Sequence, residues 1–226
     1  MHLKKEFFNR NTIVVAKELL GKYLVRNIGG KIIKARITET EAYCGIKDKA
    51  CHASKGLTER TKIMFGPPGH AYVYLIYGIY HCLNVVTREK GCPEAVLIRS
   101  AEITNYKLHK AQITDIHKAQ IKTKSTDIRK HKRVCVFYGL DSVFCLCSGS
   151  CALCFKLNGL NGPGILCREL KIDKKLNGID LTNSKELWIE SAGWRSGERP
   201  IKVRRGKRIG VDYAGKWKDK LWHFYI

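Results

Sequence analysis

Acidic residues are scarce in this chain. Its 226 residues include 20 Asp and Glu against 42 Lys and Arg, which gives a formal net charge of +22. A field of this sign indicates a polyanionic partner, which could be DNA, RNA or an acidic membrane surface. A generally basic proteome would also raise the charge of an unrelated protein, but the size of the excess favours nucleic acid.

The chain also has no long hydrophobic run, and we expect no secretion signal. Its first residues are charged and contain no apolar segment followed by small residues. The longest mostly apolar stretch, 71–86, is shorter than a spanning helix requires and contains His81, Asn84 and four tyrosines. We therefore expect a cytoplasmic protein, nucleoid-associated if it is bacterial, with no membrane segment. Its ten cysteines are expected to be reduced thiols, not a disulfide framework.

The hydrophobic pattern predicts one mixed domain over residues 1–226. Hydrophobic residues make up 44% of the chain, which is enough for a core. Residues 45–69 are polar and rich in Gly and Pro, so we expect an ordered loop region there. The expected elements are a helix at 11–21, strands within 23–43 and at 95–98, a hairpin over 71–87 with Tyr77 and Gly78 at its tip, a helix around 165–170 and a strand at 187–190.

A basic and Cys-rich insertion is expected at about 104–155. The segment 109–113 recurs as 117–121, and such a duplication in polar sequence is typical of an expanded insert. Four cysteines follow within ten residues, and the last two have a spacing found in metal sites. A zinc site would be cramped in so short a segment, so free thiols are favoured and no metal is expected. These cysteines are Cys145, Cys147, Cys151 and Cys154.

Three segments carry the residues that suggest chemistry: 39–43 followed by His52, the tyrosine-rich hairpin 72–84, and Arg99 at the end of a strand. Hydrolysis of a purine N-glycosidic bond needs a carboxylate that activates water and stabilises an oxocarbenium-like sugar. It also needs aromatic walls for an extruded base, a wedge that fills the gap left in the stack, and cations for the phosphates. The three segments together supply all four.

These segments resemble the alkyladenine (3-methyladenine) DNA glycosylase family. The resemblance spans roughly 5–103 and 156–226, so it leaves out the insertion. It rests on several motifs in the same order along the chain, namely 36–45 with His52, 69–84, 96–99, 161–167, and 208–213 with Trp217 and 222–225.

The resemblance implies both a fold and an activity. The fold is α+β, with a curved, mainly antiparallel sheet, a protruding hairpin and surrounding helices, like the C-terminal domain of formyltransferases. The activity is that of a monofunctional glycosylase, which binds double-stranded DNA as a monomer and needs no cofactor. It flips alkylated or deaminated purines of the 3-methyladenine, hypoxanthine and ethenoadenine class and hydrolyses the glycosidic bond with a Glu-activated water.

Catalytic roles are carried over by position. Glu41 matches the general base that activates water, although a lone strand carboxylate is more often a surface residue. Glu39 lies two residues earlier on the same strand face and is the rival, with a supporting role favoured by the family pattern. Arg99 matches an arginine that orients Glu41 or the water and contacts a phosphate, with an ordinary strand-end arginine as its alternative.

Binding roles follow in the same way. Tyr77, at the hairpin tip, matches the side chain that intercalates into DNA, and the alternative is a tyrosine that caps the core. Asn84 matches a pocket residue that excludes guanine. The walls of the base pocket are matched by Tyr43, His52 and Tyr74, with Tyr72 either a fourth wall or a core residue.

Two other function classes compete with this interpretation. A non-catalytic nucleic-acid-binding module on the same fold would keep the basic face, but it would not need a carboxylate in a positive groove. A Cys-rich metal or redox protein would leave the tyrosine hairpin without a role.

Overall fold

The computed structural model describes residues 1–104, 135–138, 142–145, 159–191 and 202–226, with backbone only for 135–138 and 142–145. The chain divides into two compact units, one formed by 1–104 with 160–226 and the other by 105–159. In the second unit, β6 (Cys135–Tyr138) pairs antiparallel with β7 (Ser142–Cys145). The duplicated segment and the thiols of the Cys-rich stretch lie outside the described residues. The insertion at 104–155 therefore stays a prediction.

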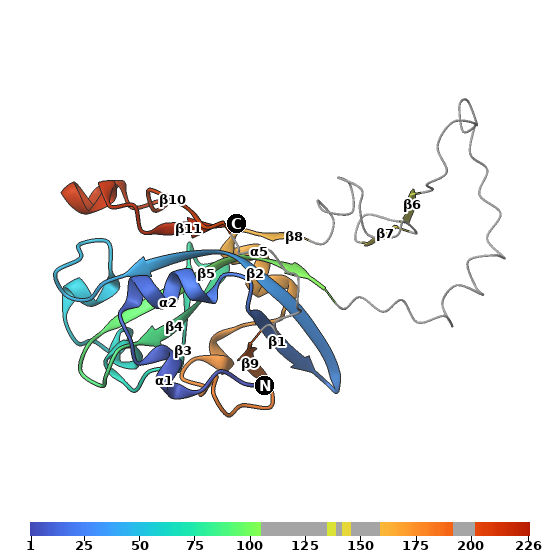
Figure 1. Ribbon diagram of the computed structural model, residues 1–226, viewed down its shortest axis with the longest axis horizontal. Coiled ribbons are helices and arrows are strands. Elements are labelled where there is room, and N and C mark those ends of the chain that lie inside the picture. Colours follow the sequence, from blue (N-terminus) through green and yellow to red (C-terminus); the bar gives the residue numbers. More distant parts are fainter. Residues whose placement is uncertain (105–134, 139–141, 146–158, 192–201) are drawn as a thin grey trace. The chain divides into compact units, whose positions relative to one another are not determined.

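The first unit is built on one curled, antiparallel sheet (Figure 1), as the family resemblance implied. Its main path runs β10-β11-β2-β5-β4-β3, with β1 joining β2 to β9 and β8 pairing with β5. The likeness to formyltransferases stays a prediction. The strands are β1 (Tyr23–Ile28), β2 (Lys31–Tyr43), β3 (Ala71–Ile76), β4 (Tyr80–Thr87), β5 (Glu94–Ile103), β8 (Gly159–Asn161), β9 (Leu187–Glu190), β10 (Arg204–Gly206) and β11 (His223–Tyr225).

Short helices surround this sheet. The side chain of Asn11 accepts hydrogen bonds from the first backbone amides of α2, which places the helix start where the sequence predicted it. The loop region 45–69 contains two 3₁₀ turns, η1 and η2, that periodicity did not predict. No helix in the described part of the chain has the length and apolar character needed to cross a membrane. The helices are α1 (Lys5–Phe8), α2 (Thr12–Leu19), η1 (His52–Lys55), η2 (Lys62–Phe65), α5 (Pro163–Glu169), η3 (Lys174–Leu176) and η4 (Asp212–Asp219).

Strand β2 presents different chemistry on its two faces. The buried Thr40 donates a hydrogen bond to the Ala16 carbonyl of α2, so this helix covers one face of the strand. Successive side chains of a strand point to opposite faces. Glu39, Glu41 and Tyr43 therefore lie on the face away from α2, which is the face that carries the candidate site.

A β-bulge interrupts the pairing of β2 with β5. Glu39 pairs with Ser100, but Thr40 pairs with Ile98, so Arg99 is left as the extra residue on β5. A bulge of this kind re-aims side chains, and bulges are common beside active sites. Here it allows two successive residues, Arg99 and Ser100, to bind the same carboxylate, that of Glu39.

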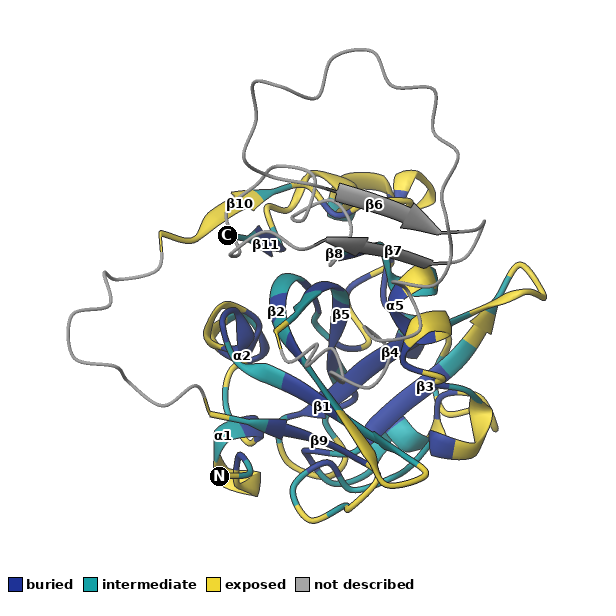
Figure 2. Cartoon of the chain, turned by 90° about the vertical axis from the view of Figure 1, so that its right-hand side faces the viewer, coloured by how far each residue is buried: buried dark blue, intermediate teal, exposed yellow. Residues whose placement is uncertain are grey.

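The β3–β4 hairpin ends in the turn that the sequence predicted. Tyr77 and Gly78 occupy its two central positions with φ of 53° and 70°, and the Ile79 amide donates to the Ile76 carbonyl across it. Positive φ at both positions is typical of a type I′ turn, where Asn and Gly are preferred. The end of the hairpin is exposed (yellow in Figure 2), and Tyr77 itself is 86% exposed.

Candidate active site

Strand register brings several candidate residues into one row across the sheet. Tyr72 of β3 pairs with Asn84 of β4, which pairs with Leu97 of β5. Leu97 pairs with Glu41 of β2, and Glu41 pairs with His223 of β11. Because paired residues point to the same face of a sheet, the row places the carboxylate between the tyrosine hairpin and the C-terminal strand.

Glu41 is fully buried and both of its carboxylate oxygens are engaged. The Tyr43 hydroxyl donates to Oε2 at 2.8 Å, and the Ile209 backbone amide donates to Oε1 at 2.9 Å. A guanidinium nitrogen of Arg99 lies 3.4 Å from Oε1. Burial and the negative charge of Glu41 raise the pKa of Tyr43 well above its ordinary value, so its hydroxyl remains a donor.

Glu39 is bound by a different set of partners. Arg99 Nε donates to it at 3.2 Å, and Ser100 and His223 contact the same carboxylate. Burial opposes the ionisation of Glu39, but the hydrogen bonds from His223 and Ser100 and the charge of Arg99 outweigh it and lower its pKa to about 2. Glu39 is therefore ionised throughout the pH range of an enzyme assay, and it links Arg99 to β11.

Four rings form a cluster that Tyr43 joins to the Glu41 carboxylate. The His52 and Tyr74 rings lie 4.6 Å apart between centroids, and the Tyr72 and Tyr74 rings 5.3 Å apart. His52 Nδ1 is 3.0 Å from the Tyr72 hydroxyl. Tyr43 packs in the same hydrophobic cluster. The structure thus brings the pocket residues together: Tyr43, His52, Tyr72 and Tyr74.

The pocket residues differ in how far a ligand could reach them. Tyr72 is only 2% exposed and belongs to a buried hydrophobic cluster, so it occupies a core position and not an open wall of the pocket. Its hydroxyl lies within hydrogen-bond distance of His52. Asn84 is 3% exposed, and its side-chain amide donates to the Tyr72 carbonyl. Tyr74 and His52 are partly exposed. A ligand at this surface would therefore meet Tyr74 and His52 before it met Tyr72 or Asn84.

The imidazole of His52 is held neutral. Burial and the positive charges of Arg60 and Lys55 lower its pKa to about 4. The Arg60 guanidinium lies 5.1 Å from the centroid of the Tyr74 ring, so this cation stands beside the ring cluster. At neutral pH His52 can accept a hydrogen bond on one nitrogen and donate one from the other.

Arg60→Gln should raise the pKa of His52, because it removes a positive charge that disfavours the imidazolium. The pKa can be followed by NMR of the imidazole carbons across pH 3 to 8. A second variant, Lys62→Gln, serves as the control, since Lys62 pairs with Glu59 and does not contribute to the His52 pKa. An unchanged His52 titration in Arg60→Gln would contradict the placement of this arginine.

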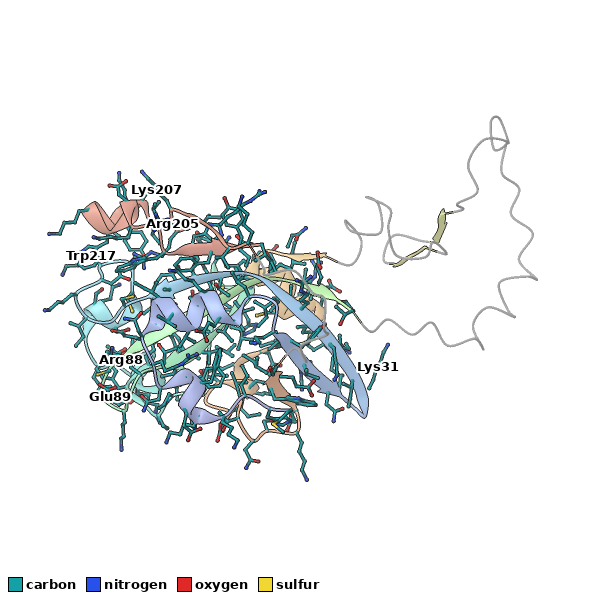
Figure 3. The ribbon with its side chains drawn as sticks, in the orientation of Figure 1. Lys31, Arg88, Glu89, Arg205, Lys207 and Trp217 are labelled. Atoms are coloured by element: carbon teal, nitrogen blue, oxygen red, sulfur yellow. The ribbon has the colours of Figure 1, made fainter. Side chains whose placement is uncertain are left out.

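Sequence reasoning missed a buried ion pair behind the site. Arg208, from the segment after β10, forms two hydrogen bonds with the carboxylate of Asp48, and both side chains have 0% exposure. Arg208 belongs to a motif that carried the family resemblance, but nothing in the sequence pairs it with a residue 160 positions away. Arg208 also donates to the Trp217 carbonyl, and Figure 3 shows Trp217 and Lys207 in the same part of the first unit.

The site can therefore hold a carboxylate in one position and surround it with donors. A buried carboxylate with an arginine and an amide beside it suits proton abstraction from water and stabilisation of a developing cation. In the part of the chain whose side chains are described, no cluster of three or more His, Cys, Asp or Glu could hold a metal ion. The buried, hydrogen-bonded carboxylate makes Glu41 a candidate general base, and the partly exposed rings of Tyr74 and His52 offer a platform for a planar ligand.

Known proteins resemble the chain over its full length. The family model described as methylpurine-DNA glycosylase matches residues 6–226. A protein of Desulfitobacterium hafniense is 40% identical over 231 residues, which cover 99% of this chain and 94% of its own length. A relative from Methanocella arvoryzae is 41% identical over 223 residues, which cover 99% of this chain and 91% of the relative. One from Clostridium perfringens is 40% identical over 227 residues, which cover 100% of this chain and 96% of the relative. All three are named "Putative 3-methyladenine DNA glycosylase".

Proposed function

The chain belongs to the methylpurine-DNA glycosylase family and is thus a DNA glycosylase of base excision repair, and we propose that it excises 3-methyladenine, hypoxanthine and ethenoadenine-type purines by Glu41-activated hydrolysis. The observation that carries this proposal is the position of Glu41. Its carboxylate is fully buried and held by Tyr43, Ile209 and Arg99, and Tyr43 packs in the same cluster as Tyr72 and Tyr74. A nucleic-acid-binding module would gain nothing from a buried negative charge on its binding face, so the catalytic function is favoured.

The proposed hydrolysis consumes water as its only second reactant. The damaged nucleotide is extruded from the duplex, and the bond from sugar C1′ to the purine nitrogen breaks as positive charge develops on the sugar. The carboxylate of Glu41 stabilises that charge and takes one proton from water, whose oxygen forms the new bond to C1′. A cationic 3-methyladenine leaves as a neutral base. A neutral purine needs a proton, which solvent or a donor in the pocket supplies.

Access to Glu41 requires a local movement. In the structure its carboxylate has no exposed surface, and the Tyr43 hydroxyl is bound to Oε2. We infer that DNA binding shifts this hydroxyl and admits the water. The carboxylate keeps its hydrogen bond from the Ile209 amide and its ion pair with Arg99 during that step, so its orientation is preserved.

The rings suit a planar and often cationic base. Tyr74 and His52 offer partly exposed faces, and the negative face of an aromatic ring attracts a methylated purine. Tyr72 fixes the His52 ring from behind through its hydroxyl. Asn84 lies deeper in the same row, where a guanine amino group would meet it. Tyr77 at the exposed hairpin tip is the residue that fills the gap in the stack.

An excision assay tests the function directly. Duplexes carrying hypoxanthine, 1,N6-ethenoadenine or 3-methyladenine are incubated with the full chain and analysed with and without alkali. We expect abasic sites from at least one lesion, and strand breaks only after alkali or heat. Tight binding to the same duplexes without release of any base would instead identify a binding module.

A further inference from the structure

The buried ion pair between Asp48 and Arg208 contacts the backbone on both sides of Tyr43, the residue whose hydroxyl binds the proposed general base Glu41. Arg208 donates to the carbonyl of Ala42 at 3.0 Å, and the carboxylate of Asp48 accepts from the amide of Cys44 at 3.1 Å. These two contacts grip the backbone immediately before and immediately after Tyr43. The guanidinium carbon also lies 4.9 Å from the centroid of the Tyr43 ring.

The same pair fixes the other donor to Glu41. Ile209, whose amide binds Oε1 of Glu41, directly follows Arg208 in the chain. The guanidinium donates to the Trp217 carbonyl at 3.1 Å and lies 5.0 Å from the centroid of the Trp222 ring, which ties this segment to η4 and to the approach to β11. Movement of Arg208 would therefore displace the Ile209 amide.

Stability alone is a weak reason for this arrangement. Burial opposes the charge on Arg208, although Asp48 more than compensates and raises the pKa of the arginine. The Nε atom of Arg208 is buried and has no hydrogen-bond partner among the described residues. Apolar side chains of similar volume often stabilise a fold as well as a buried ion pair does. What they cannot supply is a rigid set of directional contacts to Ala42, Cys44 and Trp217.

We propose that Asp48 and Arg208 are positioning residues for the Glu41 carboxylate in the hydrolysis proposed above. The ion pair holds Tyr43 through the backbone on both sides and through its ring, and it holds the Ile209 amide through the chain. The buried pair thus sets the donors to both oxygens of Glu41 in the resting site. Its hold on the Ile209 amide keeps Oε1 oriented when the Tyr43 hydroxyl moves aside. The inference rests on the proposed function, because it assigns the pair to the chemistry of that site.

Asp48→Asn is the test, since it keeps the shape of the side chain and removes its charge. We expect the single-turnover excision rate at saturating enzyme to fall about 10- to 100-fold, as small displacements of catalytic groups cause, while DNA affinity changes less than about twofold. The matched control is Ile189→Ala, a cavity in the fully buried core at β9. It should lower the melting temperature but leave the rate of the folded enzyme unchanged.

Each result decides the question. Wild-type excision in the same assay separates a failure of the proposed function from a failure of this inference. A wild-type rate in folded Asp48→Asn, an equal loss in Ile189→Ala, or a loss of DNA affinity with an unchanged saturated rate would overturn the positioning role. If Asp48→Asn does not fold, Arg208→Lys takes its place. A lysine cannot donate to both Asp48 oxygens and to two carbonyls, so the same loss of rate is expected.

Discussion

Glu41→Gln should lower the single-turnover excision rate by roughly 10² to 10⁴. Glutamine has the size of glutamate, and its side-chain oxygen can still accept from the Ile209 amide, so the fold of the site should persist. What it loses is the negative charge that takes a proton from water and stabilises the developing sugar cation. Binding of lesion-containing DNA should be retained or strengthened, because a negative charge has been removed from a basic protein. Gel-based excision and electrophoretic mobility shift measure the two properties separately.

Glu39→Gln is the matched control for this experiment. The two carboxylates lie on the same face of β2 and both contact Arg99. Glu39, however, is already bound by His223 and Ser100, and its pKa of about 2 reflects a carboxylate used for ion pairing. Its amide variant should lose less than about tenfold of the rate through a looser Arg99. If Glu39→Gln proves the more damaging change, the two assignments must be exchanged.

Local sequence pattern was sufficient for the parts of the site that lie within one element. Alternation along β2 placed Glu39 and Glu41 on one face, and the Tyr77-Gly78 pair marked the tip of the hairpin. The family resemblance then brought these segments together with His52 and Arg99. The structure places Glu41 against Tyr43 and Arg99, while the catalytic and binding roles stay predictions.

The remaining features depend on contacts between distant segments. The bulge at Arg99 follows from a register shift between β2 and β5, and neither strand carries a local signal for it. Asp48 lies in a polar loop and Arg208 in a basic run, so each resembles an exposed charge until the two segments meet. His223 joins the site only because β11 pairs with β2. Tyr72 is a core residue because the loop 45–69 covers it, and strand alternation alone could not decide this.

At the hairpin tip, local stability and function favour different residues. A substitution there should therefore raise stability and lower the excision rate. Tyr77 adopts a φ of 53°, in the left-handed region, which costs an ordinary side chain roughly 1–2 kcal/mol and which Asn tolerates better. With 86% of its surface exposed, Tyr77 contributes little packing in return. Strain of this kind persists where a particular side chain is needed for function. An aromatic ring at the tip of a protruding hairpin is suited to enter a base stack.

Tyr77→Asn should therefore leave the protein as stable or more stable, by up to about 1 kcal/mol, and slow excision about 10- to 100-fold, because unstacking a base without a wedge costs a few kcal/mol. Chemical denaturation and single-turnover excision measure the two effects. Lys171→Asn is the matched control, since Lys171 is an exposed residue with a φ of 49° after α5. This variant should gain stability without losing activity.

A tyrosine that merely caps the core would give the reverse pattern, with lower stability and a normal rate per folded molecule. Loss of both stability and activity in Tyr77→Asn would show that the ring packs against the protein, whereas a normal excision rate would remove Tyr77 from the flipping step.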